Sequence, residues 1–138
     1  MRARRLDDRG NIAVEFALVA PVFITLILGL VDYGIAAREV STMRAAARAG
    51  LQALIADSDA TTTAQTTAEA VAPDATVEVT VSCSCKDGAT VACNGTCVAG
   101  GVRKIATVTV SRDLTLLIPW PTMEDPLPLQ GIAQARIQ

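Results

Sequence analysis

The residues of this chain best suited to chemistry are four cysteines, Cys83, Cys85, Cys93 and Cys97. Four thiolates can hold a tetrahedral zinc ion, but such sites usually draw on Cys-x2–4-Cys pairs, and the Cys-Ser-Cys spacing fits them poorly. Two disulfide bonds are the alternative, and they form in oxidising compartments. We therefore expect two disulfides and no bound metal.

The spacing alone does not fix the pairing, because four cysteines allow three arrangements. A nested arrangement, Cys83 with Cys97 and Cys85 with Cys93, suits the tip of a hairpin, where paired positions have a nearly constant sum of residue numbers. This is the arrangement that we expect. Each bridge would stabilise a small domain by roughly 2–4 kcal/mol.

The other side chains offer no recognisable catalytic set. The chain has no His, which removes the commonest general base and the commonest metal ligand. Asp57 and Asp59 are better explained as loop and cap residues than as paired catalytic acids. The net charge of −2, with one Trp, one Tyr and two Phe, does not suit a nucleic-acid surface. We expect no enzyme activity, no cofactor, no nucleic acid and no small-molecule substrate.

A further candidate is Glu15, which is the only charge within the apolar run of residues 12–31. A helix of twenty residues spans about 30 Å, which is the thickness of the hydrocarbon core of a bilayer. We expect a transmembrane helix over residues 11–34, bent at Pro21, which membrane helices tolerate. The alternative is a buried helix in a larger assembly.

The flanks of this run predict its orientation. Four arginines precede the run, and two acidic residues, Asp7 and Asp8, lie among them. The arginines are Arg2, Arg4, Arg5 and Arg9. Because cytoplasmic flanks carry an excess of basic residues, the N-terminus is expected in the cytoplasm. The prediction is a single-pass protein of the inner (cytoplasmic) membrane whose C-terminal domain is periplasmic or extracellular.

The string at residues 9–16, Arg-Gly-Asn-Ile-Ala-Val-Glu-Phe, resembles the processing site of type IV prepilin-like proteins. The resemblance implies that residues 1–10 are a leader, cleaved between Gly10 and Asn11 by a prepilin peptidase, and that the apolar segment stays. An ordinary secretory signal is the alternative, with a later cut near residues 34–36. Such signals have shorter apolar regions, of about 7–15 residues, and are cleaved after them.

Cleavage at this site would give Glu15 a role. The α-amino group freed on Asn11 would lie four residues before Glu15, on the same helix face. An unpaired charge is costly in apolar surroundings, so the carboxylate would neutralise the ammonium of its own chain or of a neighbour. Glu15 and the adjoining Phe16 are therefore the candidate assembly residues. The alternative is that Glu15 reaches water from the end of the helix.

Three further strings carry a family resemblance: Val-Glu-Phe-Ala-Leu-Val-Ala-Pro-Val at residues 14–22, Leu-Gly-Leu-Val-Asp-Tyr-Gly at residues 28–34, and Ala-Ala-Ala-Arg-Ala-Gly at residues 45–50. Residues 9–50 thereby resemble TadE-like proteins, the pseudopilins of the tight-adherence pilus and related secretion systems. The resemblance implies a minor pilin, with other pilins and the assembly platform as partners and the surface pilus as a further location. The alternative is a membrane-anchored binding module that never enters a pilus.

The remaining chain predicts an α+β fold, in which a long N-terminal helix lies against a small antiparallel sheet stapled by the disulfides. Residues 35–72 are expected as a helical stem followed by a linker helix at 63–71, with a low-complexity linker as the alternative. The stem has an apolar stripe for packing on the sheet, formed by Val40, Met43, Ala47, Leu51 and Leu54.

Residues 73–138 are expected as the β-rich domain, with three or four strands. Alternation predicts strands at 77–81 and 105–111, and residues 131–137 could close the sheet. Residues 114–118 either extend the second strand or begin another. Four prolines between residues 119 and 128 indicate an extended connection, in which Trp120 is expected to anchor the core or its rim.

Overall fold

The structure is a computed structural model that describes residues 8–98 and 100–137, with side chains from residue 12 onward. Most of the predicted leader thus lies outside the described residues. The elements follow the chain in a simple order, with the helices first: α1 Asp8–Ala56, α2 Thr61–Val71, β1 Thr76–Ser84, β2 Arg103–Leu114 and β3 Leu127–Ile137. The predicted α+β fold is confirmed.

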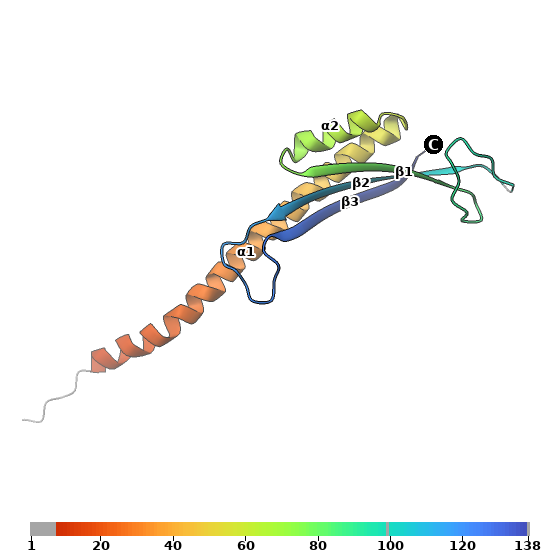
Figure 1. The fold of residues 1–138 in the computed structure, drawn as a ribbon. Coiled ribbons are helices and arrows are strands. Elements are labelled where there is room, and N and C mark those ends of the chain that lie inside the picture. Colours follow the sequence, from red (N-terminus) through yellow and green to blue (C-terminus); the bar gives the residue numbers. More distant parts are fainter. Residues whose placement is uncertain (1–7, 99, 138) are drawn as a thin grey trace, which may run out of the picture.

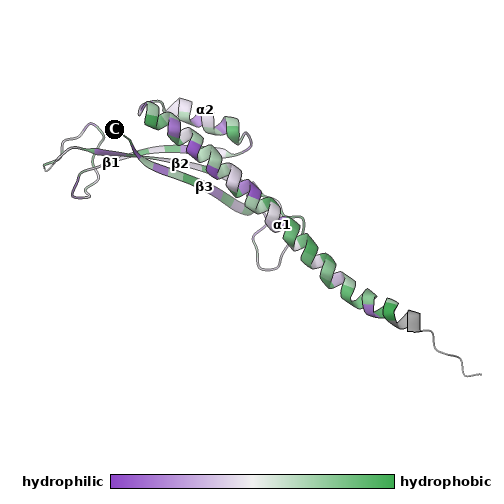
Figure 2. Cartoon of the chain, turned by 180° about the vertical axis from the view of Figure 1, so that it is seen from behind, coloured by the Kyte–Doolittle hydropathy of each residue, from purple (hydrophilic) through white to green (hydrophobic). Residues whose placement is uncertain are grey.

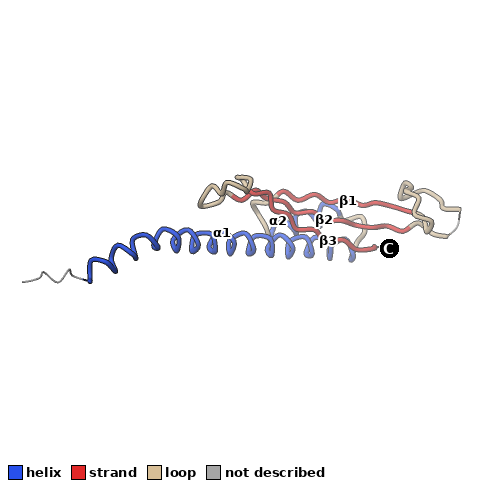
Figure 3. Tube along the Cα trace, turned by 90° about the horizontal axis from the view of Figure 1, so that it is seen from below, coloured by secondary structure: helices blue, strands red, loops and turns tan. Residues whose placement is uncertain are grey.

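Helix α1 runs through both the predicted membrane segment and the predicted stem as one helix of 49 residues. At 1.5 Å per residue its length is roughly 70 Å. Pro21 lies inside the helix, and the Thr25 hydroxyl donates a hydrogen bond of 2.8 Å to its carbonyl oxygen. The N-terminal half of α1 projects away from the rest of the chain, as Figures 1 and 3 show.

The three strands form one antiparallel sheet in the order β1-β2-β3. Val108 of β2 lies opposite Val79 of β1 and Ala133 of β3. One face of the sheet packs on the two helices, because Ala106, Val108 and Val110 of β2 are all fully buried. The described strands number three. Along each of them, more buried residues alternate with less buried ones, as in a sheet that is covered on one face.

The predicted apolar stripe of α1 is confirmed. Met43, Ala47, Leu51 and Leu54 are buried in the core, and Val40 packs against it. Helix α2 approaches α1 closely at Gly50. A Cβ atom there would lie only 2.8 Å from the carbonyl oxygen of Ala64, so the close approach requires a glycine. Helix α2 begins two residues earlier than predicted and ends where expected, at Val71.

The chain between β2 and β3 differs from the prediction. Strand β2 ends at Leu114, so the predicted strand over residues 114–118 is wrong beyond its first residue. Strand β3 begins at Leu127, so Pro128 belongs to the sheet rather than to the connection, and it pairs with Asp113. A proline is tolerated there because β3 is an edge strand, and edge strands are where sheets accommodate proline.

Both disulfides are present, but the nested pairing is wrong. Cys83 bonds to Cys93, and Cys85 bonds to Cys97, with Cα–Cα distances of 5.1 and 5.7 Å. The sum rule does not apply because the chain pairs twice here: Ser84 pairs with Arg103 of β2 and also bridges to Thr90, so the cysteines do not follow a single hairpin register.

A smaller turn folds inside this excursion. Thr90 bridges to Ser84, and the Val91 N–H donates to the Cys83 carbonyl oxygen at 3.0 Å. The chain therefore returns beside Cys83 before it reaches Cys93. As a result Cys83 bonds to Cys93, and Cys85 bonds to Cys97. The resulting disulfide-bonded tip lies at the end of the sheet remote from the projecting half of α1 (Figure 1).

The crossed pairing predicts which thiol each single substitution releases. In Cys83→Ser the thiol of Cys93 becomes free, whereas the nested arrangement would release Cys97 instead. In Cys97→Ser the free thiol is that of Cys85. Alkylation under acidic, non-reducing conditions followed by peptide mass spectrometry identifies the modified cysteine in each variant. Release of Cys97 from the first variant would contradict the observed pairing.

A second prediction concerns the contact of β3 with α1. A Cβ atom on Gly131 would lie 2.5 Å from the carbonyl carbon of Met43 and 2.6 Å from the backbone nitrogen of Arg44. Backbone atoms cannot move aside locally, so Gly131→Ala should lower the free energy of unfolding by about 1–3 kcal/mol or more. Thermal unfolding of the detergent-solubilised chain, followed by circular dichroism, measures the loss.

The matched control is Gly101→Ala. A Cβ atom at Gly101 would meet no heavy atom within 4 Å, so its melting temperature should stay near that of the parent chain. Equal melting temperatures for the two variants would show that the helix and the strand are not in close contact at Gly131.

Candidate functional site

The first part of the candidate site is the projecting half of α1. Its large apolar side chains are exposed along the whole run, including Phe16 and Leu30 at 71% each. Figure 2 shows this half of the helix as mostly apolar, in contrast to the half beside the sheet. Exposed apolar patches of this extent mark interaction surfaces. The described part of the chain contains one helix long and apolar enough to cross a membrane.

Glu15 lies on this half of α1 with its side chain exposed, next to Phe16. Asn11 belongs to the same helix, one turn earlier, but its side chain lies outside the described residues. Gly10 also belongs to α1. The pairing of Glu15 with a freed amino group on Asn11, and the cleavage that would free it, therefore stay predictions.

The second part of the site lies where the apolar run ends. Here residues 115–126, which we call the collar loop, pack against α1. Asp32 is buried at 6% exposure. One carboxylate oxygen, Oδ1, accepts the backbone N–H of Leu117 at 3.0 Å, and the other, Oδ2, accepts the indole N–H of Trp120 at 3.1 Å. Because the acceptor is a carboxylate, both bonds are stronger than bonds between neutral groups.

A glycine lets the indole ring reach the helix. A Cβ atom on Gly29 would lie 3.1 Å from the Trp120 ring, so an alanine there would require the ring to shift by a few tenths of an ångström. Leu116 is buried, and its N–H donates to Asp125 Oδ1 at 3.4 Å, which links the two ends of the collar loop. Trp120 is thus a rim anchor, as predicted from the sequence, and its contact is with the end of the apolar helix.

The sequence alone did not single out Asp32, although the string that carries the family resemblance includes it. Its signal is local: an acidic residue directly after an apolar run, in a chain with a single Trp and a proline-rich connection. Nothing in that pattern identifies the partner, because Asp32 and Trp120 are 88 residues apart.

A hollow of about 230 Å³ remains between the collar loop and α1. Its lining is almost wholly apolar, and it includes Gly29, Ala36, Trp120, Met123 and Leu127. Ligand pockets for drug-sized molecules usually measure about 300–1,000 Å³. The hollow is therefore too small for such a ligand. The one carboxylate in its lining, that of Asp32, already accepts hydrogen bonds from Leu117 and Trp120.

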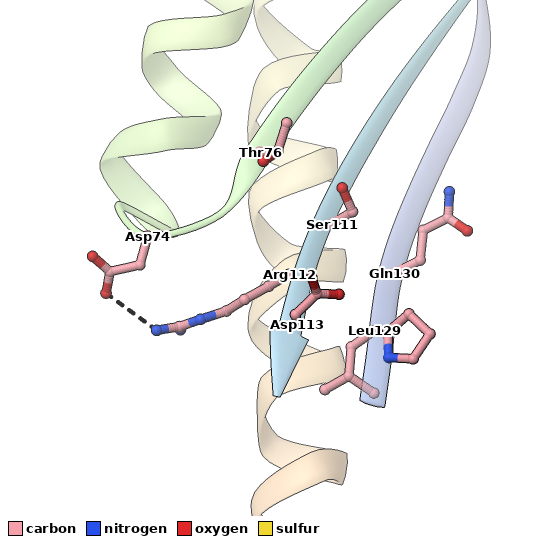
Figure 4. Close-up of a pocket in the computed structure, with 8 residues that line it drawn as sticks. Asp74, Thr76, Ser111, Arg112, Asp113, Leu129 and Gln130 are labelled. Atoms are coloured by element: carbon pink, nitrogen blue, oxygen red, sulfur yellow. Dashed lines mark hydrogen bonds and ion pairs between the residues drawn. The ribbon is translucent and has the colours of Figure 1, made fainter. Parts of the chain in front are cut away.

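A larger, polar hollow of about 710 Å³ lies at the end of the sheet (Figure 4). Its most prominent side chain, Arg112, forms ion pairs with Asp74 at 3.2 Å and with Glu39 of α1 at 3.1 Å. Two carboxylates therefore already neutralise this guanidinium. Its role is to connect α1, β2 and the turn before β1. No group of three or more metal-ligating side chains occurs among the described residues.

Comparison with known proteins gives one match. The model of the TadE-like protein family matches residues 10–52, which confirms the resemblance predicted from the sequence. The match covers the apolar run, Asp32 and most of the stem, and it ends before the sheet begins. No curated protein matches the chain, and no solved structure matches it.

The bonds to Asp32 predict how the collar loop is held. In Asp32→Ala the N–H groups of Leu117 and Trp120 lose their acceptor, so the loop should detach from α1. Endoproteinase Glu-C, acting on the detergent-solubilised chain, should then cut faster after Glu124, which lies in the loop. Asp113→Ala, which removes an exposed carboxylate next to the loop, should leave the cleavage rate unchanged. Equal rates in all three chains would show that Asp32 does not hold the loop.

Proposed function

We propose that the chain is a minor pilin or pseudopilin, a structural subunit of a tight-adherence (Tad, Flp-type) pilus assembly and secretion system. The observation that carries the proposal is the division of α1 into two halves. The C-terminal half is packed into its own domain, whereas the apolar N-terminal half is left uncovered by the residues that the structure describes. Such a helix needs a bilayer or other helices around it.

The TadE-like match supports this reading, because it spans both halves of α1. In the stem, the matched residues include Ala46, Ala47 and Gly50, which are buried where α1 meets α2 and the sheet. TadE-like proteins are structural and pilus-related. The proposed role is therefore assembly rather than catalysis.

Processing is the first step of the proposed role. The chain enters the inner membrane with its N-terminus in the cytoplasm and its sheet domain in the periplasm or outside the cell. A prepilin peptidase then cuts between Gly10 and Asn11. The basic leader is lost, and the apolar helix keeps its place with a new ammonium group at its end and Glu15 one turn away.

Assembly is the second step. The apolar half of α1 leaves the lipid and packs against the helices of neighbouring pilins, guided by the assembly platform. Glu15 then pairs with the N-terminal ammonium of its own chain or of a neighbour, since either charge alone would be costly in apolar surroundings. The stem offers an open face for such neighbours, because Ala37, Ser41 and Ala45 are exposed at four-residue spacing.

The alternative function is a membrane-anchored binding module. It is favoured by one observation: the disulfide-bonded tip lies at the far end of the sheet from the apolar helix (Figure 1). A tip placed there reaches furthest from the membrane, where a partner would be met. This alternative requires the membrane helix but no entry into a fibre.

Glu15→Gln tests the pilin proposal in cells that contain the fibre system and its peptidase. Both the parent and the variant should begin at Asn11 by N-terminal sequencing. The variant should be recovered in sheared fibres at least roughly tenfold less than the parent, because each 1.4 kcal/mol lost from a contact is tenfold in an equilibrium constant. Glu78→Gln, an exposed change on β1, is the matched control and should be incorporated normally.

The outcomes separate the two steps and the two functions. A mature protein that began at Met1 or at Arg38 would contradict the proposed processing. Normal incorporation of Glu15→Gln would show that the carboxylate does not guide assembly. A parent chain that is processed yet never recovered with fibres would favour the binding module.

A further inference from the structure

We propose that the collar loop, residues 115–126, is a second membrane contact that lies in the lipid headgroup region of the bilayer. The proposal rests on the membrane helix of the proposed function and adds a separate lipid-binding surface to it. The partner is the outer lipid surface of the membrane that α1 crosses.

The position of the loop is the first argument. Trp120 packs on Gly29, and Asp32 accepts two hydrogen bonds from the loop. Gly29 lies two residues before the end of the apolar run, which is about 3 Å along a helix axis. If the run fills the hydrocarbon core, the collar loop is therefore held at the level of the headgroups.

The side chains of the loop are the second argument. Leu117 is 60% exposed and Met123 is 56% exposed, although both are apolar. Tyr33, which follows Asp32 in α1, is 73% exposed. Trp and Tyr are enriched at membrane–water interfaces, where the ring meets the acyl chains and the polar end meets water. The collar loop adds this kind of surface directly beside the helix that crosses the membrane.

The polar groups of the loop are the third argument, because unpaired donors would be costly near lipid. Asp32 accepts the backbone N–H of Leu117 and the indole N–H of Trp120, and Asp125 accepts the backbone N–H of Leu116. Three further positions, at residues 119, 121 and 126, are prolines and have no N–H to pair. The loop has thus paired or lost many of the donors that would resist contact with lipid.

The charges of the loop restrict the class of lipid. Residues 115–126 contain Glu124 and Asp125 but neither Lys nor Arg. The contact therefore depends on apolar insertion and not on attraction to anionic headgroups. Neutral phosphatidylcholine should support it fully.

The chain provides its own probe, because Trp120 is its only tryptophan. The full chain is reconstituted into phosphatidylcholine vesicles that contain lipids brominated either near the headgroup or deep in the acyl chain. The shallow bromines should quench the fluorescence of Trp120 more than the deep ones, and acrylamide in the water should quench it poorly. Flotation of the same samples with the vesicles measures membrane insertion of the helix independently.

Two variants ask whether the exposed apolar side chains make the contact. Leu117→Asp and Met123→Asp should each reduce quenching by the shallow bromines and increase quenching by acrylamide. Ile132→Asp is the matched control, since Ile132 is also 56% exposed but belongs to β3. Its quenching should equal that of the parent, and all four chains should float with the vesicles.

Other outcomes overturn the proposal in distinguishable ways. A chain that floats while acrylamide quenches Trp120 and the bromines do not would have its loop in water, and the membrane helix would stand without the second contact. A Trp120 shielded from both quenchers would be covered by protein, such as a second copy of the chain, and not by lipid. A chain that fails to float would contradict the membrane helix itself.

Discussion

The rest of the structure depends on the continuity of α1 across the end of its apolar run. A single helix of 49 residues joins a half that needs an apolar environment to a half that belongs to a folded domain. Pro21, the proline within α1, lies well before this junction, so no missing backbone bond of a proline bends the helix there. The direction of α1 at the junction therefore sets the direction of the sheet. Asp32 lies at this junction, where it holds a loop of the sheet domain against the helix.

The domain is fixed to the stem by close backbone contacts. Gly50 allows α2 to approach α1, and Gly131 allows β3 to approach it. Since neither site has room for a methyl group, the helices and the sheet pack with little freedom to shift. Arg112 adds a polar link at the end of the sheet nearer the collar loop. A force applied to the apolar helix is therefore transmitted to the domain as a whole.

The sequence predicted those features that depend on local periodicity. The stripe through Met43 and Leu54 follows from three- and four-residue spacing, and the core of β1 and β2 follows from alternation. The features that it missed depend on distant partners. The bond of Trp120 to Asp32 and the pairing of Cys83 with Cys93 are set by where the sheet register places each segment, and no local pattern encodes that register. The sequence places Pro128 in the connection because proline is rare in strands except at the edge of a sheet. The sequence does not show that this strand, β3, is an edge strand.

The specificity of the proposed assembly cannot come from the hydrophobic effect, because an apolar helix gains little hydrophobic free energy when it moves from lipid into a helix bundle. Lipid tails are about as apolar as Leu or Ile, so moving the apolar half of α1 from a bilayer into a bundle of helices changes its hydrophobic free energy little. Packing of small residues and polar pairing must then decide which helices associate and in what register. Glu15 is the only charged side chain within the apolar run of residues 12–31. A carboxylate that must find an ammonium accepts few registers, whereas the leucines and isoleucines around it accept many.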